Sequence, residues 1–195
     1  MDLFRRILSF AALGAGVAAA AYAGLVTGAI SVDLGLGRRL RSLGPQIVDL
    51  DAPREVVFDV ISQPYLGHQT HALAEKVRIL ERTSGMVLAA HYTPIREWLL
   101  AQTVETIRFK PPERVDFRLV RGPVPHVVEE FLLIEQEKRT RLEYRGEMGT
   151  DLWILGRRWG EIVARRWEKA VAASIASVKA EAERRASSRR PLEGH

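Results

Sequence analysis

The chain has 195 residues, of which 47% are hydrophobic and 27% are charged, so one ordinary globular domain with an appendage is expected. It contains no cysteine, which excludes disulfides, thiolate metal sites and a cysteine nucleophile. The formal net charge of +5 is spread along the chain rather than gathered in one block, and it favours an anionic membrane surface over nucleic acid as a partner.

Near the N-terminus, residues 7–32 carry no charge. This run is long enough to cross a bilayer as a helix, and it predicts a single-pass transmembrane anchor over residues 1–32. A cleaved secretory signal is the alternative, with Arg5 and Arg6 as its basic start and residues 21–23 as its cleavage box, but the length of the run favours a retained anchor. Arginines are almost balanced on its two sides, and we expect the following domain in the cytoplasm.

Small residues recur at every fourth position of this run, at Ala12, Gly16, Ala20, Gly24 and Gly28. Such a stripe lets two transmembrane helices approach closely, which would make the protein a homodimer through this helix. An alanine-rich segment also produces the spacing by chance, so both interpretations stay open.

The next segment, residues 33–44, is rich in glycine and arginine without a sustained period, and we interpret it as a linker. Residues 46–50 alternate polar and apolar side chains, which predicts a strand. Apolar residues then recur at the spacing of one helix face, which predicts a short helix capped by Asp51 and ended by Gln63-Pro64. A second short helix is expected over residues 65–74.

From residue 76 the sequence alternates apolar and polar residues in short segments separated by turn residues. Consecutive strands with short connections predict an antiparallel meander with one wet face and one buried face. The predicted strands are residues 76–82, 85–94, 99–109, 114–121, 127–136 and 141–148.

The last predicted element is a helix over residues 151–186, which contain no proline. Thr150 or Asp151 can cap its start. At about 100° per residue its apolar residues fall on one stripe, opposite a face crowded with arginine, glutamate and lysine. A long helix is therefore expected to lie on the sheet.

This order of elements, with DAPREVVFDVIS at its front and a tryptophan-bearing helix at its end, resembles the START-like superfamily. The chain looks like a member of its SRPBCC, or polyketide cyclase/dehydrase and lipid transport, group over residues 45–186. The resemblance implies an α+β helix-grip fold of the START and Bet v 1 kind, in which a curved antiparallel sheet of about six to seven strands surrounds the long helix and an apolar cavity. Residues 187–195 are expected to form a basic, disordered tail.

A single helix cannot fill the whole concave face of a bent sheet, so a ligand cavity is expected toward the N-terminal half of that helix, where Gly156 and Gly160 leave space. Close packing at these glycines is the alternative. The C-terminal half, with Trp167, Val171 and Val178, is expected to pack tightly. The candidate cavity residues are His91, Thr93, Glu105, Phe117, Leu119, Phe131, Tyr144, Gly156, Gly160 and Val163.

Among residues that can carry a proton, His91 and His126 are candidate donors near strand ends. Glu105, Glu129 and Glu130 interrupt apolar strands, and a carboxylate that points inward would have a raised pKa. Charges on the outer face are the favoured interpretation of all three. The paired pattern VVEEFLLI does not tell which of Glu129 and Glu130 faces inward.

His68 and His71 have the spacing of two metal ligands, but no acidic residue or cysteine nearby in the sequence completes a site, so no metal and no cofactor are expected. The arginines and tryptophans of residues 157–167 superficially suggest phosphate and base contacts. Helical spacing assigns Trp167 to the core instead, so nucleic acid is not an expected partner. The sequence contains no phosphate-binding loop, nucleotide fingerprint or Ser-His-Asp signature.

Three functions follow from these patterns. The first is membrane-anchored binding or transport of a hydrophobic small molecule or lipid in the cavity. The second, implied by the resemblance, is a cyclase/dehydrase-type enzyme that acts on an apolar or polyketide-like substrate there, with Glu105 or His91 as base. The third is a non-enzymatic interaction module with a filled core and no ligand.

Overall fold

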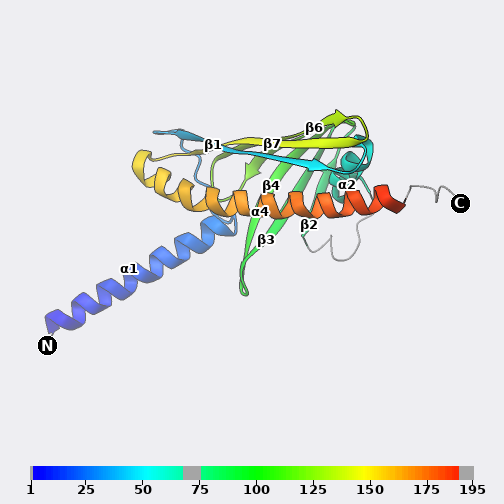
Figure 1. Cartoon of the computed structure of the whole chain (residues 1–195). Helices are drawn as coiled ribbons and strands as arrows, with labels where there is room; N and C mark the ends of the chain where they lie inside the picture. The colour runs from blue at the N-terminus through cyan, green and yellow to red at the C-terminus, as the bar shows by residue number, and fades with distance from the viewer. Residues whose placement is uncertain (1, 68–75, 189–195) are drawn as a thin grey trace, which may run out of the picture.

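Seven strands form one antiparallel sheet that wraps around a long C-terminal helix (Figure 1). The computed structural model describes residues 2–67 and 76–188, and the side chains from residue 14 onward. In chain order the elements are α1 (Asp2–Val26), β1 (Arg39–Leu50), α2 (Arg54–Leu66), β2 (Val77–Arg82), β3 (Met86–Arg96), β4 (Leu99–Lys110), β5 (Arg114–Arg121), β6 (His126–Gln136), β7 (Arg139–Thr150) and α4 (Trp153–Ser188).

The strands follow one another across the sheet from β2 to β7, and β1 closes the far edge beside β7. All six strands predicted after residue 76 are present, and their ends differ from the prediction by at most about two residues. The alternation was informative because one face of the sheet is buried, as β5 illustrates with Val115, Phe117 and Leu119. The antiparallel meander is therefore confirmed.

Strand β1 begins earlier than expected, so the linker predicted over residues 33–44 is wrong in its second half. Arg39 pairs with Thr150, and the ladder continues to Leu43 before its register shifts next to Gly44. Gly44 has a positive φ of 77°, and a Cβ there would lie 3.0 Å from the carbonyl oxygen of Tyr144. The glycine and the following proline interrupt the alternation at a β-bulge, which hides the strand in the sequence.

Helix α2 lies where the apolar spacing predicted it, but both of its ends differ. Pro53 is the residue before its first turn and makes no side-chain cap bond, so Asp51 is not the cap. The Asp51 carboxylate instead lies 2.5 Å from Nε of Arg139. The helix continues through Pro64 to Leu66, because the proline falls in the last turn and the buried Tyr65 packs into the core. Of the second predicted helix, residues 68–75 lie outside the described part of the chain.

The long helix α4 confirms the predicted C-terminal helix and runs two residues further than predicted. Asp151 does not cap it. Its carboxylate accepts hydrogen bonds from the backbone N–H groups of Leu34 and Gly35, and an ion pair joins it to Arg38. The side chain that was expected to begin the helix therefore fixes the segment before β1. Most of the predicted tail lies outside the described residues.

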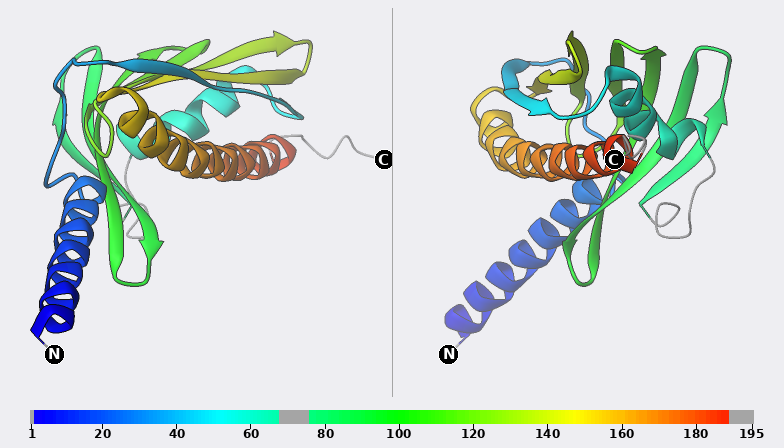
Figure 2. Two further views of the ribbon diagram at one scale, coloured as in Figure 1. Left: turned by 90° about the vertical axis from the view of Figure 1, so that its left-hand side faces the viewer. Right: turned by 45° about the vertical axis from the view of Figure 1, so that its right-hand side comes forward.

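Helix α1 projects away from the domain, as two further views show (Figure 2). The side chains of residues 14–21 are exposed, whereas Val26, at its end, is buried against the domain. Within the described part of the chain, no helix combines the length and the apolar character needed to cross a membrane. The structure thus gives no support to the transmembrane anchor predicted for residues 1–32.

Candidate ligand cavity

A cavity of about 420 Å³ lies between the concave face of the sheet and α4. Its lining is mostly apolar and aromatic and includes Trp159, Val163, Trp167, Val171, Ile175 and Val178 of α4, Phe117, Phe131 and Leu142 of the sheet, Ile61 and Tyr65 of α2, and Tyr22 and Val26 of α1. Exposed lining residues, among them Ile162 and Arg166, mark its opening. An open cavity contradicts the interaction module with a filled core.

Six of the ten candidate cavity residues line this space. They come from strands β3 to β6 and from α4, and they are His91, Thr93, Glu105, Phe117, Phe131 and Val163. Strand alternation brings them to one face, and the bend of the sheet brings that face around the helix.

The structure places the other four candidates elsewhere. Leu119 packs beside Gly122, where a Cβ would lie 3.0 Å from a leucine methyl group, and Tyr144 is fully buried behind the lining residues Phe131 and Glu129. At Gly160 a Cβ would lie 3.0 Å from the methyl group of Thr150, and at Gly156 it would overlap the carbonyl of Asp151. The two glycines therefore allow close packing and leave no space for a ligand.

The cavity also reaches further along α4 than predicted. Trp167, Val171 and Val178 were expected to pack tightly against the sheet, but all three line the cavity and are only half-buried. The two glycines hold the beginning of α4 close to Thr150 and Asp151, so the cavity begins beyond them along the helix.

Glu129 of β6 points into the cavity, so the outer-face interpretation is wrong for this residue. Its Oε1 accepts hydrogen bonds from the hydroxyl of Tyr144 at 2.5 Å and from Nε1 of Trp167 at 2.6 Å. The neighbouring Glu130 faces outward and pairs with Arg114 at 3.1 Å. Which of the two glutamates faces inward is decided by the sheet register, which sets Glu129 opposite Gly146.

The protonation of Glu129 is shifted by its surroundings. Burial raises the pKa of its carboxyl to about 7, and the nearby negative charge of Glu105 adds to this effect. The hydrogen bonds from Tyr144 and Trp167 act in the opposite direction and lower it. Near neutral pH the group therefore exists in both its neutral and its ionised form.

Glu105 of β4 is the second carboxylate in the cavity wall, again against the outer-face interpretation. The hydroxyl of Thr103 donates a hydrogen bond to Oε1 at 2.7 Å. Its Oε2 lies 3.5 Å from Nδ1 of His91, and this buried nitrogen makes no hydrogen bond within the described part of the chain. Because this nitrogen is covered, within the pair it is Glu105, a lining residue, that can meet a molecule in the cavity.

His91 is held from its other side by Tyr65 of α2. The phenol oxygen lies 3.0 Å from Nε2 of the imidazole, and the two rings meet edge to face with centroids 5.8 Å apart. Burial, together with the charges of Glu105 and Glu129, raises the pKa of the Tyr65 phenol, so it stays a neutral hydroxyl. Tyr65, His91, Glu105 and Thr103 thus form one line of polar groups along the cavity.

The remaining histidine candidates are not part of this line. His126 is not among the cavity residues, and its Nε2 lies 3.0 Å from the exposed carboxylate of Glu147. His68 and His71 lie outside the described residues. From residue 14 to 67 and from 76 to 188, the structure brings together no group of three or more side chains suited to a metal ion.

Sequence reasoning missed Tyr65, Thr103 and the polar role of Trp167. Thr103 had a signal, because it is two residues before Glu105 and so shares its face of β4. Tyr65 and Trp167 had none, since they reach their partners across 26 and 38 residues of sequence.

No protein-family model matches the chain, and no curated protein matches it by sequence. Among solved structures, the Zhui aromatase/cyclase from Streptomyces sp. R1128 superposes with a TM-score of 0.59 at 19% identity, over 81% of this chain and 99% of that chain. The di-domain aromatase/cyclase BexL from the BE-7585A biosynthetic pathway gives 0.56 at 18% identity, over 80% of this chain and 52% of that one.

Norcoclaurine synthase from Thalictrum flavum, in complex with dopamine and hydroxybenzaldehyde, gives a TM-score of 0.55 at 10% identity, over 80% of this chain and 91% of that chain. Identities this low establish the fold alone. The protein has the helix-grip fold of SRPBCC and Bet v 1-like proteins, which the aromatase/cyclases share, and the predicted fold class of the domain is confirmed.

Proposed function

We propose that this protein binds a small, mainly apolar molecule that carries at least one polar group, and that it holds this molecule in the cavity between the sheet and α4. The observation that carries the proposal is the pair of buried carboxylates, Glu105 and Glu129, in an otherwise apolar lining. Burying a carboxylate costs free energy unless it has partners. A carboxylate beside empty space is therefore expected where a ligand completes its surroundings.

The size and the lining of the cavity support an aromatic or polycyclic ligand. A volume of about 420 Å³ falls within the roughly 300–1,000 Å³ of ordinary small-molecule sites. Rings follow one another from α2 onto the sheet, with centroids 5.8 Å apart between Tyr65 of α2 and Phe117 of β5 and 5.5 Å apart between Phe117 and Phe131 of β6. Aromatic side chains in such an array favour flat ligands through edge-to-face and offset contacts.

The polar line would then set the orientation of the ligand. A ligand hydroxyl can donate a hydrogen bond to Glu105, which lines the cavity, while the buried Nδ1 of His91 lies 3.5 Å from the carboxylate. Glu129 already accepts two hydrogen bonds from the protein, so it influences the ligand mainly through its charge.

A titration with the neutral apolar dye Nile red tests the binding proposal. Ala170 lines the cavity and Ala173 is exposed on the same helix, so Ala170→Phe fills the cavity and Ala173→Phe is its matched control. We expect Ala170→Phe to weaken dye binding by at least about tenfold, because the added ring occupies the space of the dye. Equal dye binding by both variants, or none by the unmodified protein, would contradict the proposal.

Acid–base catalysis of the cyclase/dehydrase type is the second candidate, and the state of Glu129 favours it. A carboxyl with a pKa near 7 can donate a proton to a departing hydroxyl group, which leaves as water. Glu105, the other carboxylate of the cavity wall, can remove the proton from the carbon next to a carbonyl group, so that the electron pair of that C–H bond forms the new double bond. Two of the structural neighbours named above are aromatase/cyclases, which supports this candidate.

Mass analysis of the molecules that copurify with the protein separates the two candidates. If the protein dehydrates its ligand, the Glu129→Gln variant should retain a molecule one water heavier than the one found with the unmodified protein. Glutamine keeps the acceptor oxygen for Tyr144 and Trp167 but cannot donate the acid proton. The same molecule in both proteins would support a carrier and exclude this reaction.

Membrane attachment through residues 1–32, association of two copies through that segment and a cytoplasmic domain stay predictions. Extraction of cell membranes with alkaline carbonate tests the first, because an inserted helix stays in the pellet and a peripheral protein is released. Protease protection of sealed vesicles tests the side on which the domain lies.

A further inference from the structure

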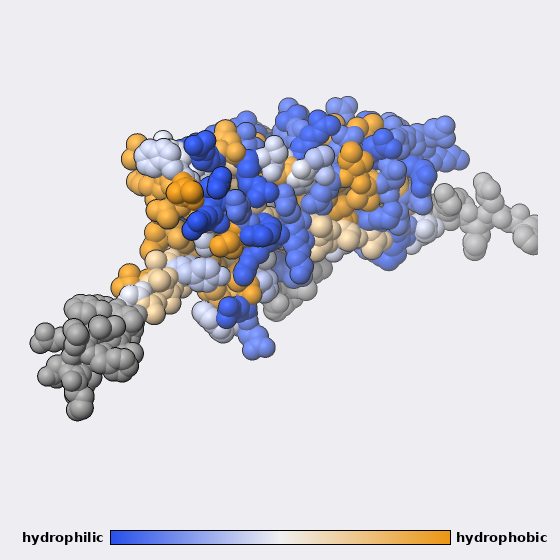
Figure 3. All heavy atoms as spheres, turned by 60° about the vertical axis from the view of Figure 1, so that its left-hand side comes forward, coloured by the Kyte–Doolittle hydropathy of each residue, from blue (hydrophilic) through white to orange (hydrophobic). Residues whose placement is uncertain are grey.

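Several large apolar side chains are exposed to solvent at the end of the molecule where α4 begins. We name this surface the apolar end patch, and its members are Leu34, Leu36, Leu152, Trp153, Ile154 and Leu155. Trp153, Ile154 and Leu155 are 57%, 58% and 69% exposed. Figure 3 shows apolar surface at this end, next to the described part of α1.

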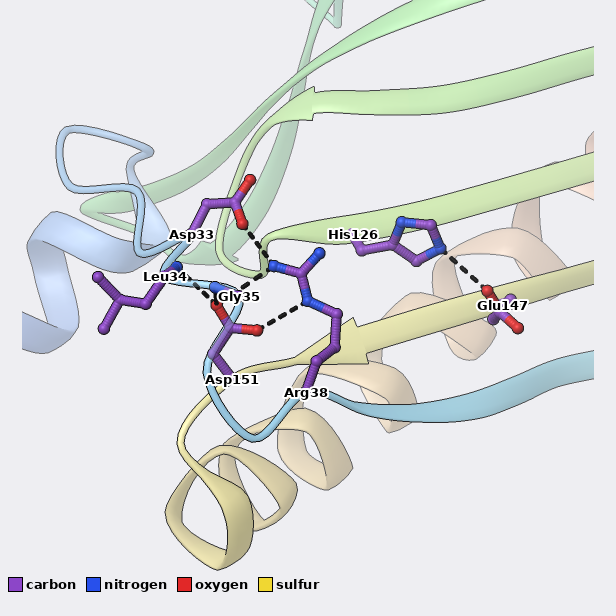
Figure 4. A network of polar contacts seen from close by, with 7 residues as sticks. All are labelled: Asp33, Leu34, Gly35, Arg38, His126, Glu147 and Asp151. Atoms are coloured by element: carbon purple, nitrogen blue, oxygen red, sulfur yellow. Dashed lines mark hydrogen bonds and ion pairs between the residues drawn. The ribbon is translucent and has the colours of Figure 1, made fainter.

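The backbone beneath the patch is built by specific contacts (Figure 4). The carboxylate of Asp151 accepts hydrogen bonds from the N–H groups of Leu34 at 2.6 Å and Gly35 at 2.8 Å, and it pairs with Arg38 at 2.7 Å. The N–H of Leu152 donates to the carbonyl of Leu36 at 2.8 Å. These bonds tie the segment before β1 to the start of α4, so the patch is a fixed surface.

Two patch residues have a backbone conformation that apolar residues rarely adopt. Leu152 and Trp153 have φ angles of 68° and 49°. The indole of Trp153 lies over Gly37, where a Cβ would come within 2.3 Å of the ring. The fold thus holds strained residues so that their large apolar side chains face water, and strain of this kind is typical of functional surfaces.

The patch is continuous with two other apolar features. Leu155 and the exposed Ile162, which borders the cavity opening, are seven residues apart and so share one face of α4. Figures 1 and 2 show α1 leaving the domain near this end, and its exposed residues 14–21 are all uncharged, with only glycine and alanine besides Val17. Arg39 and Arg158 supply exposed positive charge at the rim, and Arg157 lies next to Arg158 with its Nε 3.8 Å from the carboxylate of Glu161.

We propose that the apolar end patch docks on the surface of a lipid bilayer that contains anionic headgroups. Tryptophan and leucine with arginines at the rim match the layered chemistry of that surface, where apolar side chains enter the boundary and cations meet the headgroups. A second copy of this chain fits less well, because a symmetric contact would bring the arginines of two positively charged molecules together. Docking places the cavity opening at the bilayer, where apolar ligands are concentrated.

The absence of cysteine allows a direct test on the full chain. Ile154→Cys and Ile47→Cys are a matched pair, since the two isoleucines are 58% and 56% exposed and Ile47 lies on the outer face of β1. Each variant is labelled with an environment-sensitive nitrobenzoxadiazole dye and mixed with vesicles of phosphatidylcholine and phosphatidylserine. We expect the label at residue 154 to shift to the blue and to be quenched by nitroxide-bearing lipids, and the label at residue 47 to keep its aqueous spectrum.

Three results would overturn the proposal. An aqueous spectrum at both positions means that the patch does not meet the bilayer, and equal shifts at both positions mean that contact is unspecific. A shift at residue 154 that grows with protein concentration without vesicles, and that lipid quenchers do not affect, assigns the patch to a second copy. Thermal unfolding of both variants checks that the substitutions leave the fold intact.

The basic rim is tested in the same assay. Replacing Arg157 and Arg158 together by glutamate should weaken the vesicle-induced shift at residue 154 by roughly tenfold in lipid concentration when phosphatidylserine is present, since each cation near an anionic surface contributes measurable affinity. On phosphatidylcholine alone the substitution should have little effect. Equal weakening on both kinds of vesicle would contradict the role assigned to the arginines.

Discussion

Glu105 and Glu129 reach the same cavity from β4 and β6, with β5 between them, but their surroundings differ. The protein supplies Glu129 with two short hydrogen bonds, from a tyrosine and a tryptophan. Glu105 receives one from Thr103 and stands 3.5 Å from a histidine nitrogen that makes no hydrogen bond in the described part of the chain. Glu129 is therefore held by hydrogen bonds within the protein, and Glu105 can form hydrogen bonds with a ligand.

The largest expected effect on stability comes from removing the carboxylate of Glu129. Glu129→Ala leaves the Tyr144 hydroxyl and the Trp167 N–H without their acceptor in a buried place, which should lower the free energy of unfolding by about 3–5 kcal/mol. Urea unfolding followed by circular dichroism measures the loss. The control is Glu130→Ala, where the carboxylate faces outward, and its expected loss is below about 1 kcal/mol. Equal losses of unfolding free energy in the two variants would show that the buried hydrogen bonds of Glu129 do not stabilise the fold.

A second effect depends on pH. Because the pKa of Glu129 rises from its ordinary 4.5 to about 7 on folding, the unfolded chain loses this proton first as the pH increases. The free energy of unfolding should therefore fall between about pH 4.5 and pH 7, by about 3 kcal/mol from this group.

Comparison with Glu129→Gln isolates this contribution, because glutamine keeps the acceptor oxygen but does not titrate. The difference between the two unfolding curves should grow in favour of the variant from pH 5 to pH 8. A difference that stays constant over this range would mean that Glu129 titrates in the folded protein as it does in the unfolded chain.

The smallest effect concerns the carboxylate that is available to a ligand. Thr103→Val removes the one hydroxyl that donates to Glu105 and should lower the free energy of unfolding by about 1–2 kcal/mol, while Thr103→Ser should restore most of it. The same pair of variants should differ in affinity for a phenolic probe such as 1-naphthol, whose hydroxyl can donate to Glu105, more than Glu129→Gln differs from the unmodified protein. A larger change in affinity at Glu129 would reverse the roles given to the two carboxylates.

The sequence predicted the strands and the long helix well because their signals are local. Alternation shows which residues of a half-buried strand face inward, and a stripe at helical spacing shows which side of α4 meets the sheet. The first half of β1 was not predicted from the sequence, because its residues are mostly exposed at the sheet edge and Gly44-Pro45 interrupts the alternation. Local signals disappear where an element is neither alternating nor regular.

The cavity was only partly predictable, for a related reason. Glu105 was found as an acidic residue in an apolar strand, but its outward placement was the wrong choice, and only the register with neighbouring strands decides between Glu129 and Glu130. The contact of Tyr65 with His91 depends on how α2 packs on the sheet, which no short stretch of sequence encodes. Gly156 and Gly160 were ambiguous because a glycine can leave space or allow close packing, and here Thr150 and Asp151 fill the space.

Native mass spectrometry of the protein purified from its own cells tests the central claim most directly. The unmodified protein and Ala173→Phe should each carry one small molecule per chain that solvent extraction releases, and Ala170→Phe should be empty, because its added ring fills the cavity. Bare masses for all three proteins, together with no binding of Nile red to the unmodified protein, would contradict the account of the cavity as a ligand site.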